Sequence, residues 1–434
     1  MNSIKLISSK VESINGEIEV PGDKSITHRA VLLSMLSEGK TVIENYLNSE
    51  DIMRTIEVSR HLGADIYLKN EIMEINGTGL DGLIEPKMPL NFGNSGTSIR
   101  MFMGILAAQN FRSILTGDKS LRKRPMERVA EPLRKMGAVI ETNNGGLPVE
   151  INPKDKLKNI TLKLDIPSAQ IKSAILLASL FGEGKTILET DSITRDHTEI
   201  MLKDFSTNID ISQNRISIDG RNLISPEYIY VPGDLSSASF LILACLISKN
   251  SELKINNVGL NPTRMGFIEI MKLMNGNIEI QIDKRINSSE IIGTILVRSS
   301  DLKGIDVPTS LIASAIDELP LVFLAGACAD GSTLIKKAKE LRYKESDRIK
   351  AMVTNLSSLS IQIDEFDDGA KINGGTIKGT TLDSFDDHRI AMTCLLASCR
   401  SESPVTVNNC KNINTSFPTF KETMNSIGMS ITGA

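Results

Sequence analysis

The sequence Val20-Pro21-Gly22-Asp23-Lys24-Ser25-Ile26-Thr27-His28-Arg29 leads directly into the apolar run Ala30-Val31-Leu32-Leu33. A Pro-Gly turn, then polar residues, then an apolar helical pattern predicts that a helix begins near Lys24, with Asp23 as its cap. A helix N-terminus presents unpaired N–H groups and the positive end of the peptide dipoles, which favours a bound anion. Lys24 and Arg29 would add full positive charges at this place.

The first four residues of this stretch occur a second time, half a chain later. Val231-Pro232-Gly233-Asp234 repeats them and is followed by Ser236, Ser237, Ser239 and another apolar run. A single copy would be explained as a capped surface helix whose basic residues face water. A repeated opening instead indicates that a larger structural unit recurs along the chain.

The composition is that of an ordinary globular protein of more than one domain. The chain has 434 residues, 41% hydrophobic and 24% charged, with a net charge of −4. It is too long for one compact core, and its charge gives no reason to expect general attraction to nucleic acid or to an anionic membrane. Any anion site must therefore be built locally.

Several absences lead us to expect a soluble, cytoplasmic protein. The first residues lack the apolar segment of a signal peptide. The most apolar runs, such as Phe240–Ile247, are too short to span a bilayer. The five cysteines form no CxxC pair, which favours buried thiols in a reducing compartment.

Apolar helices that follow a polar, small-residue segment recur along the chain. Six such helix entrances are recognised, near Lys24, Asn94, Ser168, Asp234, Ile316 and Asp386. A short β-like stretch such as Lys40–Ile43 follows each helix, and then an amphipathic helix that ends in a turn such as Leu62-Gly63-Ala64. The alternation of apolar and polar residues in segments such as Ile278–Ile282 then predicts a strand. The sequence predicts a helix–strand–helix–strand unit of about 70 residues, six times over.

The repeated Val-Pro-Gly-Asp divides these units into two groups of three. We therefore expect an α/β protein with two domains, one formed by residues 1–20 plus 234–434 and the other by residues 21–233. The first helix of each unit is apolar nearly all round, as in Ala174–Phe181, and belongs inside a domain rather than on its surface. The polar entrances would then gather at one end of each domain and line a cleft where the domains face each other.

The second and third entrances carry further candidates for binding an anion. In Asn94-Ser95-Gly96-Thr97-Ser98-Ile99-Arg100, Gly96 allows close approach of the backbone to a ligand. The loop Arg122-Lys123-Arg124-Pro125 is either a solvated surface or part of the anion site, and Pro125 is placed to open the next helix. After Ser168-Ala169-Gln170, the loop Thr194–Glu199 adds Arg195 and a capping box from Thr194 or Thr198, while His197 is expected to be structural.

The fifth and sixth entrances contain carboxylates. Asp317-Glu318-Leu319-Pro320 opens a helix, where two acids also suit simple first-turn stabilisation. Arg342-Tyr343-Lys344-Glu345-Ser346-Asp347-Arg348 follows, and Asp386-Asp387-His388-Arg389 forms the sixth entrance. Carboxylates among Lys and Arg suit proton transfer beside a phosphate-bearing substrate, and equally an ion-pair network. The spacing of these residues leaves both the catalytic and the structural interpretation open.

No set of residues predicts a metal or a cofactor. The four histidines are far apart and none pairs with Cys at ligand spacing. The chain has neither a GxGxxG nor a GxxxxGK[ST] motif. A reaction would therefore depend on positioning, electrostatics and acid–base transfer.

Taken together, the motifs resemble the 3-phosphoshikimate 1-carboxyvinyltransferase (EPSP synthase) family over essentially the whole chain. The resemblance rests on Pro21–Ser25, Asn94–Thr97, Arg124-Pro125, Ser168–Gln170, Asp317–Pro320, Arg342–Arg348 and Asp387–Arg389. Each motif is weak alone, whereas all of them in order are specific. The resemblance implies two domains of three βαβαββ units, each an inside-out α/β barrel, with the active site in an interdomain cleft that closes on the substrates. We expect a monomer.

The resemblance also implies the reaction and the residues that perform it. The family transfers the enolpyruvyl group of phosphoenolpyruvate to the 5-hydroxyl of shikimate 3-phosphate, through a tetrahedral adduct and without a cofactor. The residues that match its shikimate 3-phosphate site are Lys24, Ser25, Arg29, Ser168, Ala169, Gln170, Arg195, Asp317 and Lys344. Those that match its phosphoenolpyruvate site are Lys24, Gly96, Arg124, Gln170, Arg348 and Arg389. Asp317 matches the base for the 5-hydroxyl, Glu345 the acid for the methylene carbon, and Lys24 contacts both substrates.

Two positions depart from the commonest family pattern. Thr415 stands before Ser416-Phe417-Pro418 where many members have Lys, and Ala169 stands where many have Ser. Both changes resemble the family's second sequence class, which includes members insensitive to glyphosate, some with Ala at the Gly96 position. Gly96 is retained here, so the sequence leaves open whether glyphosate inhibits the protein. It also leaves open which residue replaces the lysine that is missing at position 415.

Two alternatives compete with this interpretation. The related enolpyruvyl transferase that acts on UDP-N-acetylglucosamine usually carries a reactive Cys in the loop that matches Phe111–Met126, and this loop has none. A non-catalytic repeat protein that encircles nucleic acid would need basic residues along its helices. Here the first helices are apolar and the cations lie at the helix entrances.

Overall fold

The structure is a computed structural model that describes residues 4–433 apart from 155, 165–167, 183, 192–193, 213 and 284–289. The described residues form two compact units. Unit 1 contains those of Met1–Pro21, Pro232–Lys284 and Glu290–Ala434, and unit 2 those of Gly22–Val231.

Unit 2 consists of three repeats followed by one further strand. The first repeat contains α1 (Lys24–Leu36), β3 (Lys40–Glu44), α2 (Glu50–His61), β4 (Asp65–Lys69) and β5 (Ile72–Asn76). The second contains β6 (Leu90–Asn91), α3 (Gly96–Leu106), β7 (Ser113–Thr116), α4 (Glu127–Lys135), β8 (Val139–Asn143) and β9 (Gly146–Asn152). The third contains β10 (Thr161–Leu164), α5 (Ala169–Ser179), β11 (Lys185–Thr190), α6 (His197–Asp204), β12 (Asn208–Ser212) and β13 (Arg215–Asp219), and β14 (Tyr228–Tyr230) follows.

Unit 1 is built on the same plan and begins with β1 (Leu6–Ser8) and β2 (Asn15–Glu19). Its first repeat contains α7 (Leu235–Ile247), β15 (Glu252–Gly259), α8 (Gly266–Leu273), β16 (Asn277–Ile282) and β17 (Ile292–Arg298). The second contains α9 (Leu319–Cys328), β18 (Ser332–Ile335), α10 (Arg348–Ser358), β19 (Ile363–Phe366) and β20 (Gly369–Asn373). The third contains β21 (Thr381–Asp383), α11 (His388–Leu396), β22 (Val405–Asn408), α12 (Phe420–Ser426) and β23 (Ile431–Thr432).

Each repeat contributes one small sheet. In unit 2 the strand orders are β14-β3-β5-β4, β6-β7-β9-β8 and β10-β11-β13-β12, with the first pairing in each sheet parallel. In unit 1 they are β2-β15-β17-β16, β18-β20-β19 and β21-β22-β1-β23. The predicted α/β class is confirmed, and in the described part of the chain each repeat except the second of unit 1 has the two helices and the four-stranded sheet of the βαβαββ plan. The prediction from periodicity alone missed strands because some, such as β6 at two residues, are too short to show alternation.

The second repeat of unit 1 departs from the common plan. Its sheet, β18-β20-β19, has three strands rather than four. The segment that leads into it forms only isolated parallel bridges, Lys303 with Asp330 and Asp306 with Leu334. The chain reaches α9 through this irregular segment, and the carboxylates Asp317 and Glu318 lie just before that helix.

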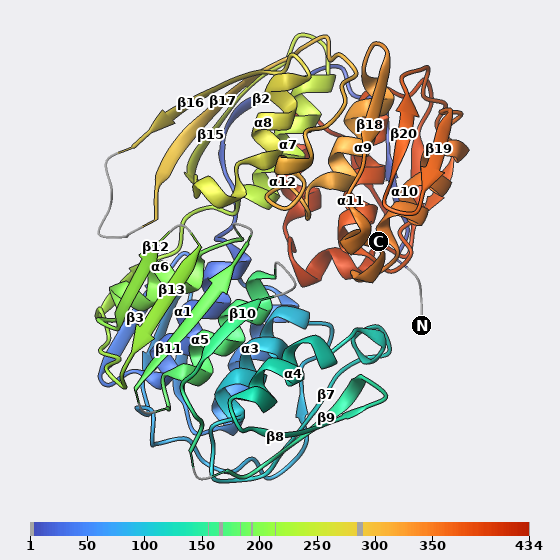
Figure 1. Cartoon of the computed structure of the whole chain (residues 1–434). Coiled ribbons are helices and arrows are strands. Elements are labelled where there is room, and N and C mark those ends of the chain that lie inside the picture. Colours follow the sequence, from blue (N-terminus) through green and yellow to red (C-terminus); the bar gives the residue numbers. More distant parts are fainter. Residues whose placement is uncertain are drawn as a thin grey trace. The chain divides into compact units, whose positions relative to one another are not determined.

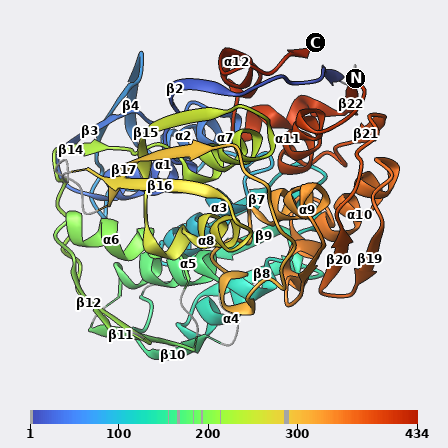
Figure 2. The ribbon, with the colours of Figure 1, turned by 90° about the horizontal axis from the view of Figure 1, so that it is seen from above.

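The first helix of each repeat is buried, as the apolar pattern predicts. Every residue of α7 is buried, and so are nine of the ten residues of α9. Figure 1 shows α7 and α9 among the strands of unit 1, and Figure 2 shows the same helices from above. Sheets on the outside and apolar helices on the inside leave the helix ends as the places where polar side chains gather.

The two copies of Val-Pro-Gly-Asp lie where the chain passes from one unit to the other. β2 pairs in parallel with β15, and these strands lie side by side in Figure 1, while β14 pairs in parallel with β3. The N–H of Asp234 donates to the carbonyl of Pro21 at 2.9 Å. Gly22 is required here, because a Cβ at this position would lie 1.9 Å from the Asn45 carbonyl oxygen.

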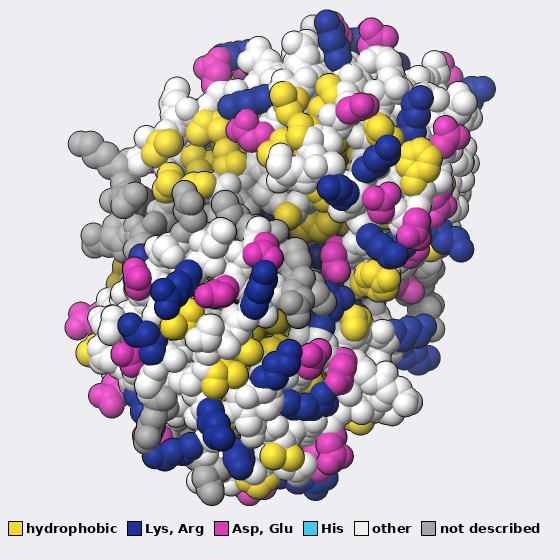
Figure 3. All heavy atoms as spheres, in the orientation of Figure 1, with side chains coloured by type: hydrophobic (Ala, Val, Ile, Leu, Met, Phe, Trp, Pro, Cys, Tyr) yellow, Lys and Arg dark blue, Asp and Glu magenta, His cyan; other side chains and the backbone are white. Residues whose placement is uncertain are grey.

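The surface is mixed in charge. On the face drawn in Figure 3, Lys and Arg side chains are interspersed with Asp and Glu, without an extended area of one sign. Within the described ranges, no helix combines the length and the apolar character needed to cross a membrane.

Candidate active site

The entrance to α1 holds a lysine against a carboxylate. Asp23 caps the helix, as predicted, by accepting a hydrogen bond from the Ile26 N–H at 2.9 Å. Lys24 forms an ion pair with Asp51, which lies in the first turn of α2. The Lys24 side chain is 21% exposed, so it remains accessible while Asp51 fixes its direction. Asp51 was not predicted, because nothing in the sequence connects α2 to this site.

Arg29 is held by hydroxyl groups from two other helices. Its Nε donates to the Thr198 hydroxyl at 2.6 Å and its Nη2 to the Ser173 hydroxyl at 2.9 Å. Its Nη1 donates to the carbonyl of Ser25 at 2.9 Å. The guanidinium is therefore buried at a point where α1, α5 and α6 meet.

The predicted capping box at α6 is wrong. The helix begins at His197 with Asp196 as its cap residue. The Thr198 hydroxyl instead accepts a hydrogen bond from Arg29. A buried guanidinium without an acceptor costs more free energy than one missing hydrogen bond at a helix end. Thr198 and Ser173 are thus site residues that the sequence did not reveal.

Gly96 lies against two guanidinium groups at the start of α3. A Cβ on Gly96 would lie 2.8 Å from Nη1 of Arg124 and 2.9 Å from Nη1 of Arg100. Arg124 also donates to the side chain of Asn94. Arg100 Nη1 donates to Oε1 of Gln170 at 2.7 Å, so Gln170 belongs to the same cluster. Two guanidiniums beside a helix N-terminus make a place suited to a carboxylate or phosphate.

Only one of the three adjacent cations of the following loop faces inward. Arg124 is 6% exposed, whereas Arg122 and Lys123 are exposed. The prediction that Pro125 opens the next helix is wrong, because α4 begins two residues later at Glu127. The N–H groups of Met126 and Glu127 both donate to the Gly145 carbonyl, which sets the start of the helix after Pro125.

A buried ion pair joins α5 to the first turn of α6. Ser168 is the cap of α5 and Ala169 its first residue. Lys172 Nζ lies 2.5 Å from Glu199 Oε1, with the two side chains 4% and 2% exposed. Lys172 also donates to the Thr194 carbonyl at 3.4 Å, next to the half-buried Arg195. Lys172 therefore joins α5 both to α6 and to the loop that carries Arg195.

Arg348 is the centre of the candidate site in unit 1. Its side chain is 1% exposed, with Nε 2.8 Å from Asp387 Oδ2 and Nη2 2.6 Å from Glu345 Oε2. Its Nη1 lies 3.6 Å from Asp317 Oδ1 and has no hydrogen-bond acceptor among the described residues. Burial alone would raise the pKa of Asp387, but the neighbouring Arg348 holds that pKa below its ordinary value. The pair is therefore ionic.

Asp317 lies between cations. Its Oδ1 is 3.1 Å from Lys344 Nζ, and the two side chains are 17% and 27% exposed. Arg389 Nη1 donates to the Asp317 carbonyl at 3.0 Å. The residues predicted for this half of the chain, Asp317, Lys344, Glu345, Arg348 and Arg389, thus lie in one cluster. Because the Asp317 carboxylate is partly exposed, a substrate hydroxyl can reach it and transfer a proton to it.

Comparison with known proteins agrees with these motifs. The model of the EPSP synthase (3-phosphoshikimate 1-carboxyvinyltransferase) family matches residues 8–424. A 3-phosphoshikimate 1-carboxyvinyltransferase of Ruthia magnifica is 44% identical over 429 residues, which cover 98% of both chains. That of Legionella pneumophila (strain Lens) is 43% identical over 429 residues and 99% of both chains. The chain belongs to the EPSP synthase family.

Solved structures support the same fold. The EPSP synthase of Acinetobacter baumannii has a TM-score of 0.88 and 40% identity over all of both chains. The enolpyruvyl transferase NikO of Streptomyces tendae has a TM-score of 0.80 at 17% identity, covering 100% of this chain and 99% of that one, and is similar in fold alone.

Thr415, the departure from the commonest family pattern, faces into the protein. It is 6% exposed, and its hydroxyl donates to the Asn412 carbonyl at 2.7 Å. Its hydroxyl is therefore used for a contact inside the protein.

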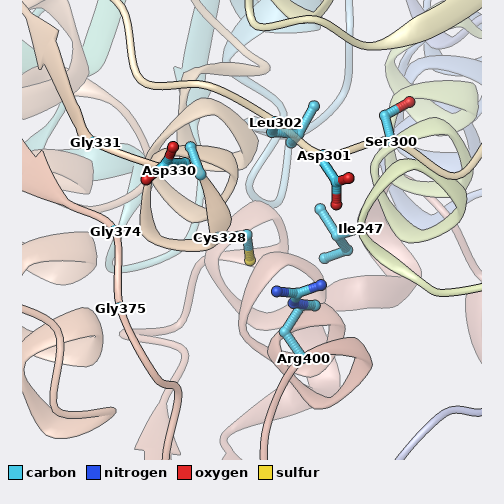
Figure 4. Close-up of a pocket in the computed structure, with 11 residues that line it drawn as sticks. Ile247, Ser300, Asp301, Leu302, Cys328, Asp330, Gly331, Gly374, Gly375 and Arg400 are labelled. Carbon is cyan, nitrogen blue, oxygen red and sulfur yellow. The ribbon is translucent and has the colours of Figure 1, made fainter.

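A separate cavity of about 480 Å³ lies in unit 1 at the C-terminal ends of α7 and α9, away from the polar entrances of these helices (Figure 4). It is lined by Ile247 and Cys328, the last residues of α7 and α9, and by Asp301, Asp330 and Arg400 among others. Burial raises the pKa of the Cys328 thiol to about 12, so the thiol is a poor nucleophile near neutral pH. The cavity contains none of the residues that match the EPSP synthase motifs.

Among the residues described, no three His, Cys, Asp or Glu side chains are grouped to hold a metal ion.

His28 is a buried titratable group in α1, the helix that also carries Lys24 and Arg29. Its Nδ1 lies 2.8 Å from the Thr55 hydroxyl, which lies 2.8 Å from the Ser98 hydroxyl, and its Nε2 has no hydrogen-bond partner in the described part of the chain. Burial, with the charges of Lys24 and Arg29 as smaller contributions, lowers the pKa of His28 well below 6.5. The neutral ring adds no charge near the two cations.

We expect His28 to make the folded protein less stable in mild acid. Below pH 6.5 the unfolded chain binds a proton at this residue while the folded protein does not, so stability falls as the pH drops, by about 1.4 kcal/mol per pH unit. Urea midpoints measured from pH 8 to pH 5 should decrease less steeply in His28→Asn than in the parent. The exposed His61→Asn is the control and should follow the parent. Equal slopes for His28→Asn and the parent would contradict the prediction.

Proposed function

We propose that this chain transfers the enolpyruvyl group of phosphoenolpyruvate to the 5-hydroxyl of shikimate 3-phosphate and releases phosphate. Membership of the EPSP synthase family supports this activity, which belongs to the shikimate pathway of aromatic amino acid biosynthesis. The residue assignment rests on one observation. Asp317, the candidate base, and Glu345, the candidate acid, both lie beside the buried guanidinium of Arg348.

The clusters of unit 2 supply cations for the substrates' anionic groups. We assign shikimate 3-phosphate to Lys24, Ser25, Arg29, Ser168, Ala169, Gln170 and Arg195, with Asp317 and Lys344 from unit 1. We assign phosphoenolpyruvate to Lys24, Gly96, Arg124 and Gln170, with Arg348 and Arg389 from unit 1. In support, Arg348 Nη1 is buried without a hydrogen-bond acceptor among the described residues, and it can donate to the substrate carboxylate.

Formation of the tetrahedral adduct needs two proton transfers. Asp317 accepts the 5-hydroxyl proton as that oxygen bonds to C2 of phosphoenolpyruvate, and Glu345 gives a proton to the methylene carbon, which becomes a methyl group. When the adduct collapses, the C2–O bond to phosphate breaks, Glu345 takes back one methyl proton to restore the double bond, and the proton held by Asp317 passes to the departing phosphate. Lys344 Nζ lies 3.1 Å from Asp317 Oδ1 and holds this carboxylate in place.

The proposal includes the organisation expected from the sequence. We take units 1 and 2 as the two domains, with boundaries near Pro21 and Pro232. A monomeric state and a cytoplasmic location complete it, and both rest on the sequence expectations.

A coupled phosphate-release assay tests the reaction directly. Purified protein should release phosphate from phosphoenolpyruvate only when shikimate 3-phosphate is also present. Omission of either substrate is the control. Equal release with UDP-N-acetylglucosamine as acceptor would assign the chain to the alternative enolpyruvyl transfer and overturn the proposal.

A further inference from the structure

The second Val-Pro-Gly-Asp copy builds a different kind of helix entrance from the first. Asp234 caps α7 by accepting from the Ser236 N–H at 3.0 Å, as Asp23 caps α1. The next residue is Leu235, where the first copy has Lys24, so the repeated segment brings no cation of its own. Asp234 and Ser236 are only 5% and 3% exposed. This entrance is part of the interior.

A cation from another element enters this buried position. Arg264 is the last residue of a 3-10 turn, Pro262–Arg264, and its side chain is 4% exposed. Its Nη2 donates to the Ser236 hydroxyl and lies 3.4 Å from Asp234 Oδ1 and 3.8 Å from Glu318 Oε1. Arg264 thus interacts with α7 and with the segment before α9.

Glu318 connects this cation to the candidate active site. It is 2% exposed, and its Oε1 accepts from the Ser236 hydroxyl and lies 3.4 Å from Nη1 of Arg389. The same Nη1 donates to the carbonyl of Asp317 at 3.0 Å. Glu318 therefore contacts the cation assigned to phosphoenolpyruvate and is the chain neighbour of the proposed base.

Simple stabilisation of a helix end does not explain Glu318. It occupies the cap position of α9, but in the described part of the chain its side chain makes no capping hydrogen bond. Its contacts go instead to α7, to α11 and to Arg264. Buried charges are stable only when they are paired, and here Asp234 and Glu318 balance Arg264 and Arg389.

We propose that Glu318 is a positioning residue that directs Arg389 and the Asp317 backbone, and that Arg264 is the cation that fixes Glu318. The inference rests on the proposed function, because it assigns Arg389 to phosphoenolpyruvate. Neither Glu318 nor Arg264 needs to touch a substrate. The serine that matches Ser25 in the first copy, Ser236, serves this internal contact in the second.

Three variants test the positioning role by kinetics. Glu318→Gln keeps the shape and removes the charge, and we expect it to raise KM for phosphoenolpyruvate about 10-fold while shikimate 3-phosphate binds within twofold of the parent. Arg264→Met should lower kcat/KM for phosphoenolpyruvate about 10²-fold, since small displacements of a positioned group have effects of this size. Arg264→Lys should recover part of that loss. Glu252→Gln removes an exposed carboxylate paired with Arg298 at 2.7 Å and is the matched control.

The outcomes separate this inference from the proposed function. A parent protein that releases no phosphate would defeat the proposed function, and a crystal structure of Glu318→Gln would still decide the positioning role. In that structure Arg389 should have lost its hydrogen bond to the Asp317 carbonyl. An unmoved Arg389, or variants that lose thermal stability but keep the parent's KM values, would overturn the inference. If Arg264→Met fails to fold, Glu318→Gln and Arg264→Lys decide the question.

Discussion

Replacement of Asp317 by Ala or Asn should reduce turnover by about 10²-fold or more, while binding of both substrates is largely retained. Asp317 is a partly exposed carboxylate of the unit 1 cluster, 3.1 Å from Lys344 and 3.6 Å from Arg348. An amide of the same size cannot accept the 5-hydroxyl proton, whereas the cations that bind the substrates remain.

Phosphate-release kinetics would measure the effect, and titration with each substrate would measure binding. Asp330→Asn is a suitable control, because Asp330 is an exposed carboxylate of the same unit in the separate cavity. Near-normal turnover of Asp317→Asn would remove Asp317 from the mechanism.

Replacement of Arg348 by Met should have the largest effect on stability. Asp387 is 0% exposed and Arg348 is 1% exposed, so the change leaves a buried carboxylate without its cation. Breaking such a pair from one side costs about 3–5 kcal/mol of unfolding free energy. Turnover should be lost as well, since Arg348 also contacts Glu345 at 2.6 Å.

The unfolding free energy of Arg348→Met, measured in urea, should be compared with that of Arg342→Met, which is the matched control. Arg342 lies in the same segment, pairs with the partly exposed carboxylates of Asp347 and Glu365, and also donates to the carbonyls of Phe366 and Asp367. Its partners can be solvated when it is removed, so its loss should cost about 1–2 kcal/mol, less than the loss of Arg348. In the parent, Arg348 lowers the pKa of Asp387, and that stabilisation is present above pH 3.8 and lost as the pH falls through the lowered pKa. The deficit of Arg348→Met should therefore shrink in acid. A deficit that is equal for both variants, or independent of pH, would contradict this explanation.

Local patterns in the chain were enough to predict the α/β class, the repeats and the buried first helices. Apolar character on all sides of α5 and α7 is a property of neighbouring residues, and burial follows from it. The cap at Asp23 was predictable for the same reason, since it needs only the residue itself and the N–H three positions later. The EPSP synthase motifs were likewise readable, because each lies within a few consecutive residues at a helix entrance.

Contacts between distant residues were decided only by the tertiary structure. Thr198 bonds to Arg29, and Arg264 reaches Ser236 and Glu318, across separations that carry no periodic signal in the sequence. A buried charge takes whichever partner the packing of helices brings near, because leaving it unpaired costs more than any local preference supplies. For this reason the sequence located the helix entrances, and the packed structure decided that the α1 entrance holds an accessible lysine while the α7 entrance holds a buried serine that supports Glu318.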